Sequence, residues 1–313
     1  MGAVCFSYIN LLPYAWKAVI YPHKISRCGD EKGTRMQRSI TRKSINAYKQ
    51  YLFAAEKAKA TVTKYINEAE RLAEYLNSNP LNKRALLEYR ETLAENFSSR
   101  TVNTKLAAIN GYLSFIGADE YKVQLLKVQR RAFIDESREL SAAEYKRLVN
   151  AADVGGNERL SLVMQTICVT GIRISELSYI TVDAVKERRM EIRLKGKSRT
   201  VIIPSKLCKK LVEYARRQRI DTGAVFRTKG GKPLDRANVC HDMKRLCDAA
   251  HVERSKVFPH NLRHLFARAF YSIEKNLSHL ADVLGHSSIE TTRIYVAASS
   301  RQYERMLDKM KLI

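Results

Sequence analysis

The stretch LGHSSIETTRIYV, Leu284–Val296, places a histidine and a tyrosine nine positions apart near the end of the sequence. The chain contains 16 tyrosines, so Tyr295 has a special role only if other residues give its hydroxyl a task. An unbroken helix from His286 to Tyr295 would hold the two side chains about 13 Å apart along its axis, at ~1.5 Å per residue. Two groups at that separation would not easily meet one substrate atom.

The residues between this histidine and this tyrosine predict a bend. Ser287 and Glu290 form a capping box, which predicts a helix start directly behind the histidine. Thr291 and Thr292 are poor helix formers because β-branched side chains lose rotamer freedom in a helix. We therefore expect the chain to bend between these threonines and the tyrosine, so that the phenol returns toward the histidine.

The whole chain is strongly basic. Its 313 residues carry a formal net charge of +24, and the length favours two domains. An excess of Lys and Arg on this scale is typical of proteins that bind nucleic acid. A basic surface that serves only solubility is the alternative, but the charge exceeds what solubility requires.

The six cysteines do not indicate a metal site or a disulfide framework. They form no C-x-x-C pair, and no histidine stands at zinc spacing from them. Free thiols of this kind fit a reducing, cytoplasmic setting.

The sequence divides into four parts. Residues 1–40 are a leader that we expect to be poorly ordered: its apolar start is interrupted by a proline and a lysine and is too short for a membrane span. Met36 is an alternative start to Met1. Residues 41–126 form a helical domain, 127–137 a charged linker and 138–313 a second domain.

The first domain shows helical periodicity throughout. TVTKYINEAERLAEYL and NKRALLEYRETLAE each predict a helix with one apolar face. SSRTVNTKLAAINGYLSFIG predicts another, capped by Ser98 or Ser99. Its start offers four polar side chains as DNA contacts in the major groove, although a solvated face is the alternative for each. They are Arg100, Thr101, Asn103 and Lys105.

The second domain is mainly helical with a small β-structure. SAAE, Ser141–Glu144, is a capping box that starts its first helix. MEIRL and TVIIP predict a hairpin with Lys195, Gly196 and Lys197 at its tip. AVFRTKGGKPLD predicts a third short strand and a turn.

Six side chains of this domain form a set suited to phosphoryl transfer. They are Arg173, Lys195, His260, Arg263, His286 and Tyr295. Arginine forks can bind phosphate oxygens, a histidine can accept a phenol proton, and a lysine can protonate a sugar-hydroxyl leaving group. The set contains no carboxylate cluster of the kind that holds Mg²⁺, so we expect no metal and no cofactor.

The motifs TGIRISEL, HNLRH and LGHSSIETTRIY, in this order, resemble those of the tyrosine recombinases, also called phage integrases. The resemblance covers roughly residues 44–313. It implies a mainly α fold with a small β-sheet of three strands. An N-terminal helical, SAM-like core-binding domain would precede a tyrosine-recombinase catalytic domain.

The resemblance also implies a role for each motif residue. Arg173 and Arg263 would bind the scissile phosphate, and His286 would hydrogen-bond a non-bridging oxygen. Tyr295 would attack to form a 3′-phosphotyrosine, with His260 assisting proton transfer.

The remaining implied roles concern the leaving group and the surroundings of the phosphate. Lys195 would protonate the leaving 5′-oxygen, with Lys197 as the alternative, and Glu176 would orient active-site groups. Arg173 and Glu176, three apart, could also form a simple ion pair.

The partners implied are double-stranded DNA with specific recombination sites, further copies of the chain in a tetramer, and accessory DNA-bending proteins, without a membrane. The C-terminal segment predicts a short amphipathic helix that packs on its own domain or on a neighbouring protomer. Its apolar stripe consists of Tyr303, Met306, Leu307, Met310 and Ile313. Competing functions are a type IB topoisomerase and a non-catalytic DNA-binding regulator.

Overall fold

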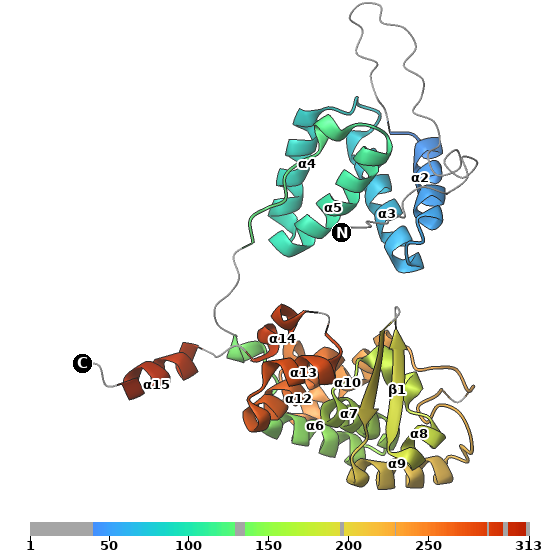
Figure 1. Cartoon of the computed structure of the whole chain (residues 1–313), viewed down its shortest axis with the longest axis vertical. Coiled ribbons are helices and arrows are strands. Elements are labelled where there is room, and N and C mark those ends of the chain that lie inside the picture. Colours follow the sequence, from blue (N-terminus) through green and yellow to red (C-terminus); the bar gives the residue numbers. More distant parts are fainter. Residues whose placement is uncertain are drawn as a thin grey trace, which may run out of the picture. The chain divides into compact units, whose positions relative to one another are not determined.

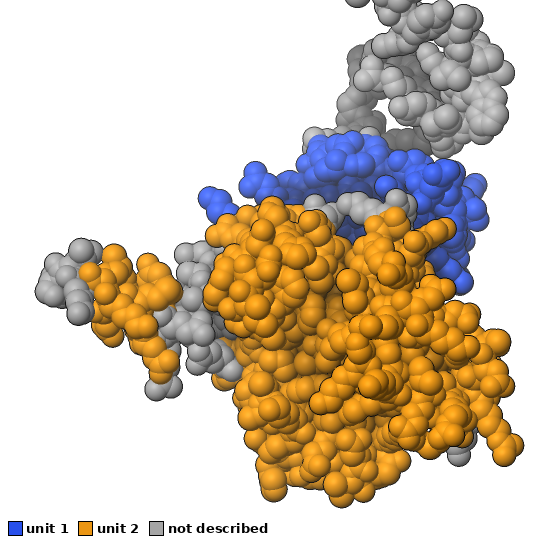
Figure 2. Space-filling view, turned by 60° about the horizontal axis from the view of Figure 1, so that its bottom comes forward, with its two compact units in different colours: residues 1–129 blue, residues 130–313 orange. Residues whose placement is uncertain are grey.

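The computed structural model describes residues 40–128, 135–194, 197–228, 230–286, 288–296 and 300–310. Its contacts divide the chain into two compact units, Met1–Gln129 and Arg130–Ile313 (Figure 2). The division falls inside the segment predicted as a linker. The leader up to residue 39, the hairpin-tip residues 195 and 196, and Ser287 of the predicted capping box lie outside the described residues.

Unit 1 is a bundle of helices (Figure 1). Its elements are α2 (Arg42–Ala54), α3 (Lys59–Leu76), α4 (Lys83–Asn96), α5 (Ser99–Phe115) and the short η2 (Asp119–Tyr121). Ser98 is the residue that caps α5, because its hydroxyl accepts a hydrogen bond from the Thr101 amide. The predicted apolar stripe of α5 is buried and packs against α3. It consists of Val102, Leu106, Ile109 and Leu113.

Unit 2 is mainly helical with one hairpin. Its elements before the hairpin are η3 (Glu136–Arg138), α6 (Ala142–Val154), α7 (Glu158–Thr170), η4 (Ile174–Tyr179) and α8 (Val182–Glu187). The hairpin is β1 (Arg189–Leu194) and β2 (Lys197–Ile202). After it come α9 (Ser205–Arg217), α10 (Arg236–Arg245), α11 (Cys247–Ala250), η5 (Arg254–Lys256), α12 (Pro259–Glu274), α13 (Leu277–Leu284), α14 (Ile289–Val296) and α15 (Ser300–Met310).

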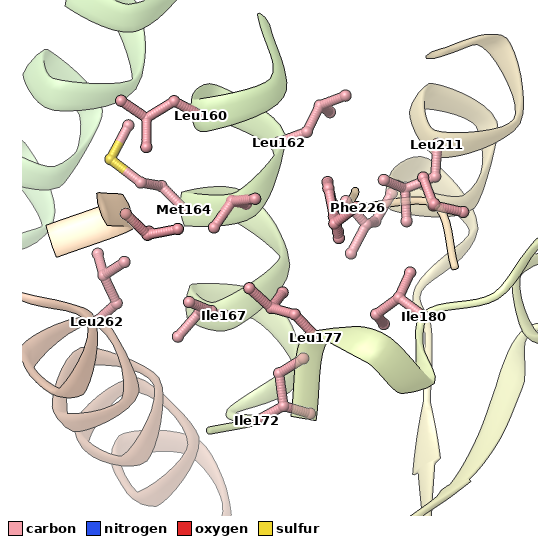
Figure 3. Packing of buried hydrophobic residues seen from close by; sticks show 14 of the residues in the cluster. Leu160, Leu162, Met164, Ile167, Ile172, Leu177, Ile180, Leu211, Phe226 and Leu262 are labelled. Atoms are coloured by element: carbon pink, nitrogen blue, oxygen red, sulfur yellow. The ribbon is translucent and has the colours of Figure 1, made fainter. Parts of the chain in front are cut away.

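The core of unit 2 is built around α7. Figure 3 shows Met164 and Ile167 of this helix beside Leu262 of α12, with Leu211 and Phe226 on the other side. The α7 sequence carries apolar residues on nearly every face, which is typical of a helix surrounded by other elements. This burial fixes α12, which packs against α7 and begins with the HNLRH motif.

The predicted three-strand sheet is wrong, because the described part of the chain forms a sheet of two strands only. β1 and β2 pair antiparallel from Arg189–Ile202 to Leu194–Lys197. The segment expected to supply the third strand forms isolated bridges instead, Thr181 with Ala224 and Arg227 with Pro233. A proline and the positive φ of Gly231 turn this segment back on itself, so it has no run of free amides for the hairpin edge.

Two further properties concern the described ranges alone. No helix there is both long and apolar enough to cross a membrane. No group of three or more His, Cys, Asp or Glu side chains within them could hold a metal ion.

Candidate active site

The chain does bend near the end of unit 2, but not where the sequence predicted. α13 ends at Leu284, and Gly285 follows in the left-handed region with φ +65°. His286 lies in this turn, and α14 begins only at Ile289 and runs unbroken through Tyr295. The rings of His286 and Tyr295 have centroids 5.2 Å apart. A glycine at the helix end made the bend, because it adopts positive φ without strain.

The phenol of Tyr295 meets the start of α12. Its oxygen lies 3.1 Å from Nε2 of His260, which stands in the first turn of that helix and stays partly open to solvent. Tyr295 itself is only 5% exposed. The structure thus joins the predicted nucleophile to the histidine predicted to assist it.

The ring of His264 completes the packing around the phenol. Its centroid lies 4.3 Å from that of Tyr295, and its Nδ1 lies 3.3 Å from Oε1 of Glu139. Arg268, one turn further along α12, also pairs with Glu139. The Tyr295 ring therefore contacts two histidines of one helix face.

Arg263 is the largest fully buried side chain among the described residues, at 1% exposure. Its Nη1 donates to the carbonyl of Gly171, and its Nη2 donates to the carbonyl of Leu284 at 2.6 Å. Nη2 also lies 2.9 Å from Nε2 of His286. Burial, then the charge of Arg173, lowers the pKa of Arg263 to about 10, so the guanidinium remains charged at neutral pH.

Both ring nitrogens of His286 are engaged. Because the guanidinium of Arg263 can only donate, Nε2 of His286 must accept and the proton must sit on Nδ1. That Nδ1–H donates to Oγ1 of the buried Thr292 at 2.8 Å. In this arrangement His286 has no N–H left for a phosphate oxygen, so its predicted role requires that Arg263 release Nε2 and that the ring proton move there from Nδ1.

Arg173 caps η4 and lies on the accessible side of the site. Its backbone amide donates to Oε2 of Glu176 at 2.7 Å, and its Nη1 lies 3.1 Å from Oε1. Glu176 is completely buried, whereas the Arg173 side chain is 36% exposed. The turn before it depends on Gly171, whose φ is +67° and whose added Cβ would lie 2.4 Å from the ring of Phe266.

The lysine candidates are not resolved by the geometry. Lys195 lies outside the described residues. Lys197 begins β2, paired through its backbone with Leu194.

Two of the four side chains predicted to contact DNA are turned inward. Asn103 bonds both the amide and the carbonyl of Leu126. Lys105 is 7% exposed and lies 3.0 Å from both carboxylate oxygens of Glu68. These contacts correct the expectation for Asn103 and Lys105, which hold unit 1 together, and leave Arg100 and Thr101 exposed at the start of α5.

The electrostatics of the site favour an anion. Three guanidinium groups, those of Arg173, Arg199 and Arg263, lie close enough to affect one another's protonation. Only the carboxylate of Glu176 pairs with any of the three among the described residues. An excess of buried positive charge is unfavourable unless an anion balances it, and a phosphodiester supplies one.

The same charges keep the histidines neutral. Partial burial, then the neighbouring His264 and Arg263, lowers the pKa of His260 to about 4. Burial, then Arg263 and Arg173, lowers the pKa of His286 to about 4. A neutral His260 can accept the phenol proton, and a phosphate anion would raise its pKa toward a useful value.

Sequence reasoning missed four residues of this site. Arg199, His264 and Thr292 contact predicted residues directly, and Glu139 reaches the site through His264. Arg199 and His264 stand inside the hairpin and HNLRH motifs, so their positions could have suggested them. Thr292 likewise stands inside the motif LGHSSIETTRIY, whereas Glu139 lies outside every motif and joins the site only through packing.

The second unit matches a known family. Residues 138–302 fit the model of the phage integrase family. Tyrosine recombinase XerA of Pyrococcus furiosus is 24% identical over 284 residues, covering 88% of this chain and 97% of the relative. Tyrosine recombinase XerH of Campylobacter jejuni is 29% identical over 279 residues, covering 80% of this chain and 77% of the relative.

Solved structures show the same fold. The XerH site-specific recombinase bound to difH substrate, a pre-cleavage complex, aligns with a TM-score of 0.64 at 19% identity, over 85% of this chain and 84% of that chain. A lambda integrase dimer bound to a COC' core site aligns with a TM-score of 0.67 at 15% identity, over 83% of this chain and 96% of that chain.

Proposed function

The chain belongs to the phage integrase family, and we propose that Tyr295 is the nucleophile with which this tyrosine recombinase cleaves and rejoins DNA at specific sites. The observation that carries the assignment is the 3.1 Å contact between the phenol oxygen and Nε2 of His260. The Tyr295 ring also lies beside two motif histidines, with centroids 5.6 Å from that of His260 and 5.2 Å from that of His286.

Each step of the proposed reaction forms one phosphoester bond and breaks another. The Tyr295 oxygen attacks the scissile phosphorus, its proton passes to His260, and the bond from phosphorus to the 5′-oxygen breaks. The leaving oxygen takes a proton from Lys195, or from Lys197 in the alternative assignment. A 5′-hydroxyl from another strand then attacks the 3′-phosphotyrosine and gives its proton to that lysine. The bond from phosphorus to the Tyr295 oxygen breaks, and His260 returns a proton to the phenol, so rejoining needs no ATP.

The arginines provide the phosphate clamp. Arg173 offers an accessible fork, whereas Arg263 and Tyr295 are 1% and 5% exposed. The arrangement is therefore a resting one, and DNA must displace the turn around Gly285 to reach them. The displacement would free Nε2 of His286 from Arg263. In the other tautomer Thr292 donates to Nδ1, and the Nε2–H can then donate to a non-bridging oxygen.

Unit 1 is proposed to be the core-binding domain and residues 138–313 the catalytic domain. Arg100 and Thr101, exposed at the start of α5, remain candidates for DNA contact. Such contacts would act mainly with phosphates and would weaken with salt.

Assembly on DNA is proposed to be tetrameric. Among solved neighbours, lambda integrase forms a tetramer on a Holliday junction. The apolar side chains of α15 are 45–54% exposed, which suits docking on another protomer better than packing on unit 2. Accessory DNA-bending proteins and a cytoplasmic location belong to the same proposal. The relatives are recombinases, and no observation favours a topoisomerase or a regulator.

The test is a covalent trapping assay with the full chain. The probe is a nicked duplex built on the sequence that the purified chain selects from a random pool. Wild-type protein should form an adduct that survives denaturation, and Tyr295→Phe should bind the duplex but form none. Tyr271→Phe, on α12, is the matched control and should form the adduct. An adduct with Tyr295→Phe would refute the assignment.

A further inference from the structure

A third arginine stands at the centre of the site. Arg199 lies on β2 opposite Ile192 of β1, and two residues before Val201. Ile192 and Val201 are buried, so the pleat places Arg199 on the face of the hairpin that packs against the helices. Its side chain is only 13% exposed.

The guanidinium of Arg199 binds the carboxylate that orients Arg173. Its Nη2 lies 2.7 Å from Oε2 of Glu176. The same oxygen accepts from the backbone amide of Arg173, while Oε1 faces Nη1 of Arg173. Glu176 is completely buried, so both of its oxygens depend on these two arginines.

Arg199 also supports the turn that carries His286. A Cβ added to Gly285 would lie 2.4 Å from Nη1 of Arg199 and 2.7 Å from its Cδ. On the other side, Nη2 of Arg173 lies 3.5 Å from the Gly285 carbonyl. The Gly285 backbone therefore lies against both side chains, and Glu176 joins them.

The ion pair between Arg199 and Glu176 holds both side chains in one orientation. Burial lowers the pKa of Arg199, although the charge of Glu176 opposes that shift. An arginine nevertheless keeps its charge in proteins, and its planar fork has little freedom once bound. Removing it would leave Glu176 with one partner and free that carboxylate to turn.

We propose that Arg199 is a positioning residue that holds Glu176, and through it Arg173, in the orientation that binds the scissile phosphate. This rests on the proposed function, because it assumes that Arg173 meets that phosphate. Arg199 acts through these neighbours and does not itself touch the DNA.

A double-mutant cycle tests the proposal, with the full chain and the selected nicked duplex. Arg199→Met should slow adduct formation by ~100-fold, as expected for loss of an oriented charge in the transition state. In an Arg173→Lys background the same change should add less than about threefold, because the two act as one unit. If Arg199→Met slowed adduct formation by the same factor in both backgrounds, the proposal would be overturned.

A second readout separates positioning from simple loss of folding. A methylphosphonate at the scissile position removes the charge that the clamp binds. On this substrate the ratio of the wild-type rate of adduct formation to the Arg199→Met rate should fall at least tenfold. An unchanged ratio would overturn the proposal. Arg199→Lys keeps the charge but not the planar fork. It should slow adduct formation less than Arg199→Met on the phosphodiester, and its difference from wild type should likewise shrink on the methylphosphonate.

The controls distinguish failure of the Arg199 proposal from failure of the proposed function. Arg189→Met changes an exposed arginine of the same hairpin and should cleave like wild type. Duplex binding by Arg199→Met should stay within about threefold of wild type, since the residue is buried away from solvent. If wild type forms no adduct, or Tyr295→Phe forms one, the proposed chemistry fails rather than the role of Arg199.

Discussion

The phenol oxygen of Tyr295 and Nε2 of His260 lie 3.1 Å apart although 35 positions separate them in the sequence. The contact exists because α14 packs against α12, and α12 is fixed by its packing on α7. The structure therefore already holds the proposed nucleophile against a neutral histidine.

This contact predicts the effect of removing the acceptor. His260→Gln should slow adduct formation by ~100-fold or more, within the range for general acid–base catalysis. Raising the pH should restore part of the rate, because hydroxide can then accept the proton in place of His260. Single-turnover trapping between pH 7 and 9.5 measures this, with exposed His241→Gln as the control. If the rate of His260→Gln relative to wild type did not rise with pH, His260 would not be the acceptor of the phenol proton.

The histidine pKa values predict how stability depends on pH. His286 has a folded pKa of about 4, below its ordinary value of 6.5, so between these values the unfolded chain binds more protons. Stability should therefore fall as the pH drops from 6.5 toward 4 and be insensitive to this residue above 7. Urea unfolding at pH 7.5 and 5 should show a smaller pH effect in His286→Gln than in wild type. An equal pH effect in both proteins would contradict the lowered pKa.

Gly285 should be intolerant of a side chain. Gly285→Ala places a Cβ 2.4 Å from Arg199 in a backbone with φ +65°. Gly156→Ala is the matched control, since Gly156 has φ +69° and nothing within 4 Å of its added Cβ. Both should lose ~1 kcal/mol from backbone strain, but only Gly285→Ala should also lose adduct formation. Equal adduct formation by the two variants would show that cleavage does not depend on the close contact between Gly285 and Arg199.

Lys105 and Arg100 should separate stability from DNA affinity. Lys105→Met leaves Glu68 buried with only the more exposed Arg71 as partner, and should cost about 3 kcal/mol of unfolding free energy. Its effect on the salt dependence of DNA binding should be negligible. Arg100→Met should leave stability unchanged and reduce the salt slope by about 1 if it contacts one phosphate. Urea unfolding and binding titrations at several salt concentrations test both, and the reverse pattern would restore Lys105 as a DNA contact.

The C-terminal helix should serve assembly rather than folding. Deleting residues 300–313 removes α15, whose apolar residues are about half exposed, so the melting temperature should hardly change. Formation of higher-order complexes on paired DNA sites should weaken at least tenfold. Native gels and thermal melts of the full and shortened chains compare the two effects. A large loss of melting temperature would favour packing on unit 2.

The sequence alone determined most of the helices and the hairpin, and it predicted the chemistry. Heptad-like spacing predicted α3, α4 and α5, the Ser141 capping box predicted the start of α6, and β-branched runs predicted the hairpin. The motif residues could be named because their types suit phosphoryl transfer and because their motifs resemble those of the tyrosine recombinases. These properties depend on residues close in the chain, where periodicity and capping rules apply.

Tertiary structure decided what lies against what. Lys105 and Arg100 share a helix start and a charge, yet one binds Glu68 and the other faces solvent. The bend fell at Gly285 rather than at the threonines, and Thr292 became a partner of His286. Arg199 acquired its place only when the hairpin packed beside η4 and brought Glu176 within 2.7 Å. Such contacts join residues far apart in sequence, and packing among whole elements, not local preference, sets those distances.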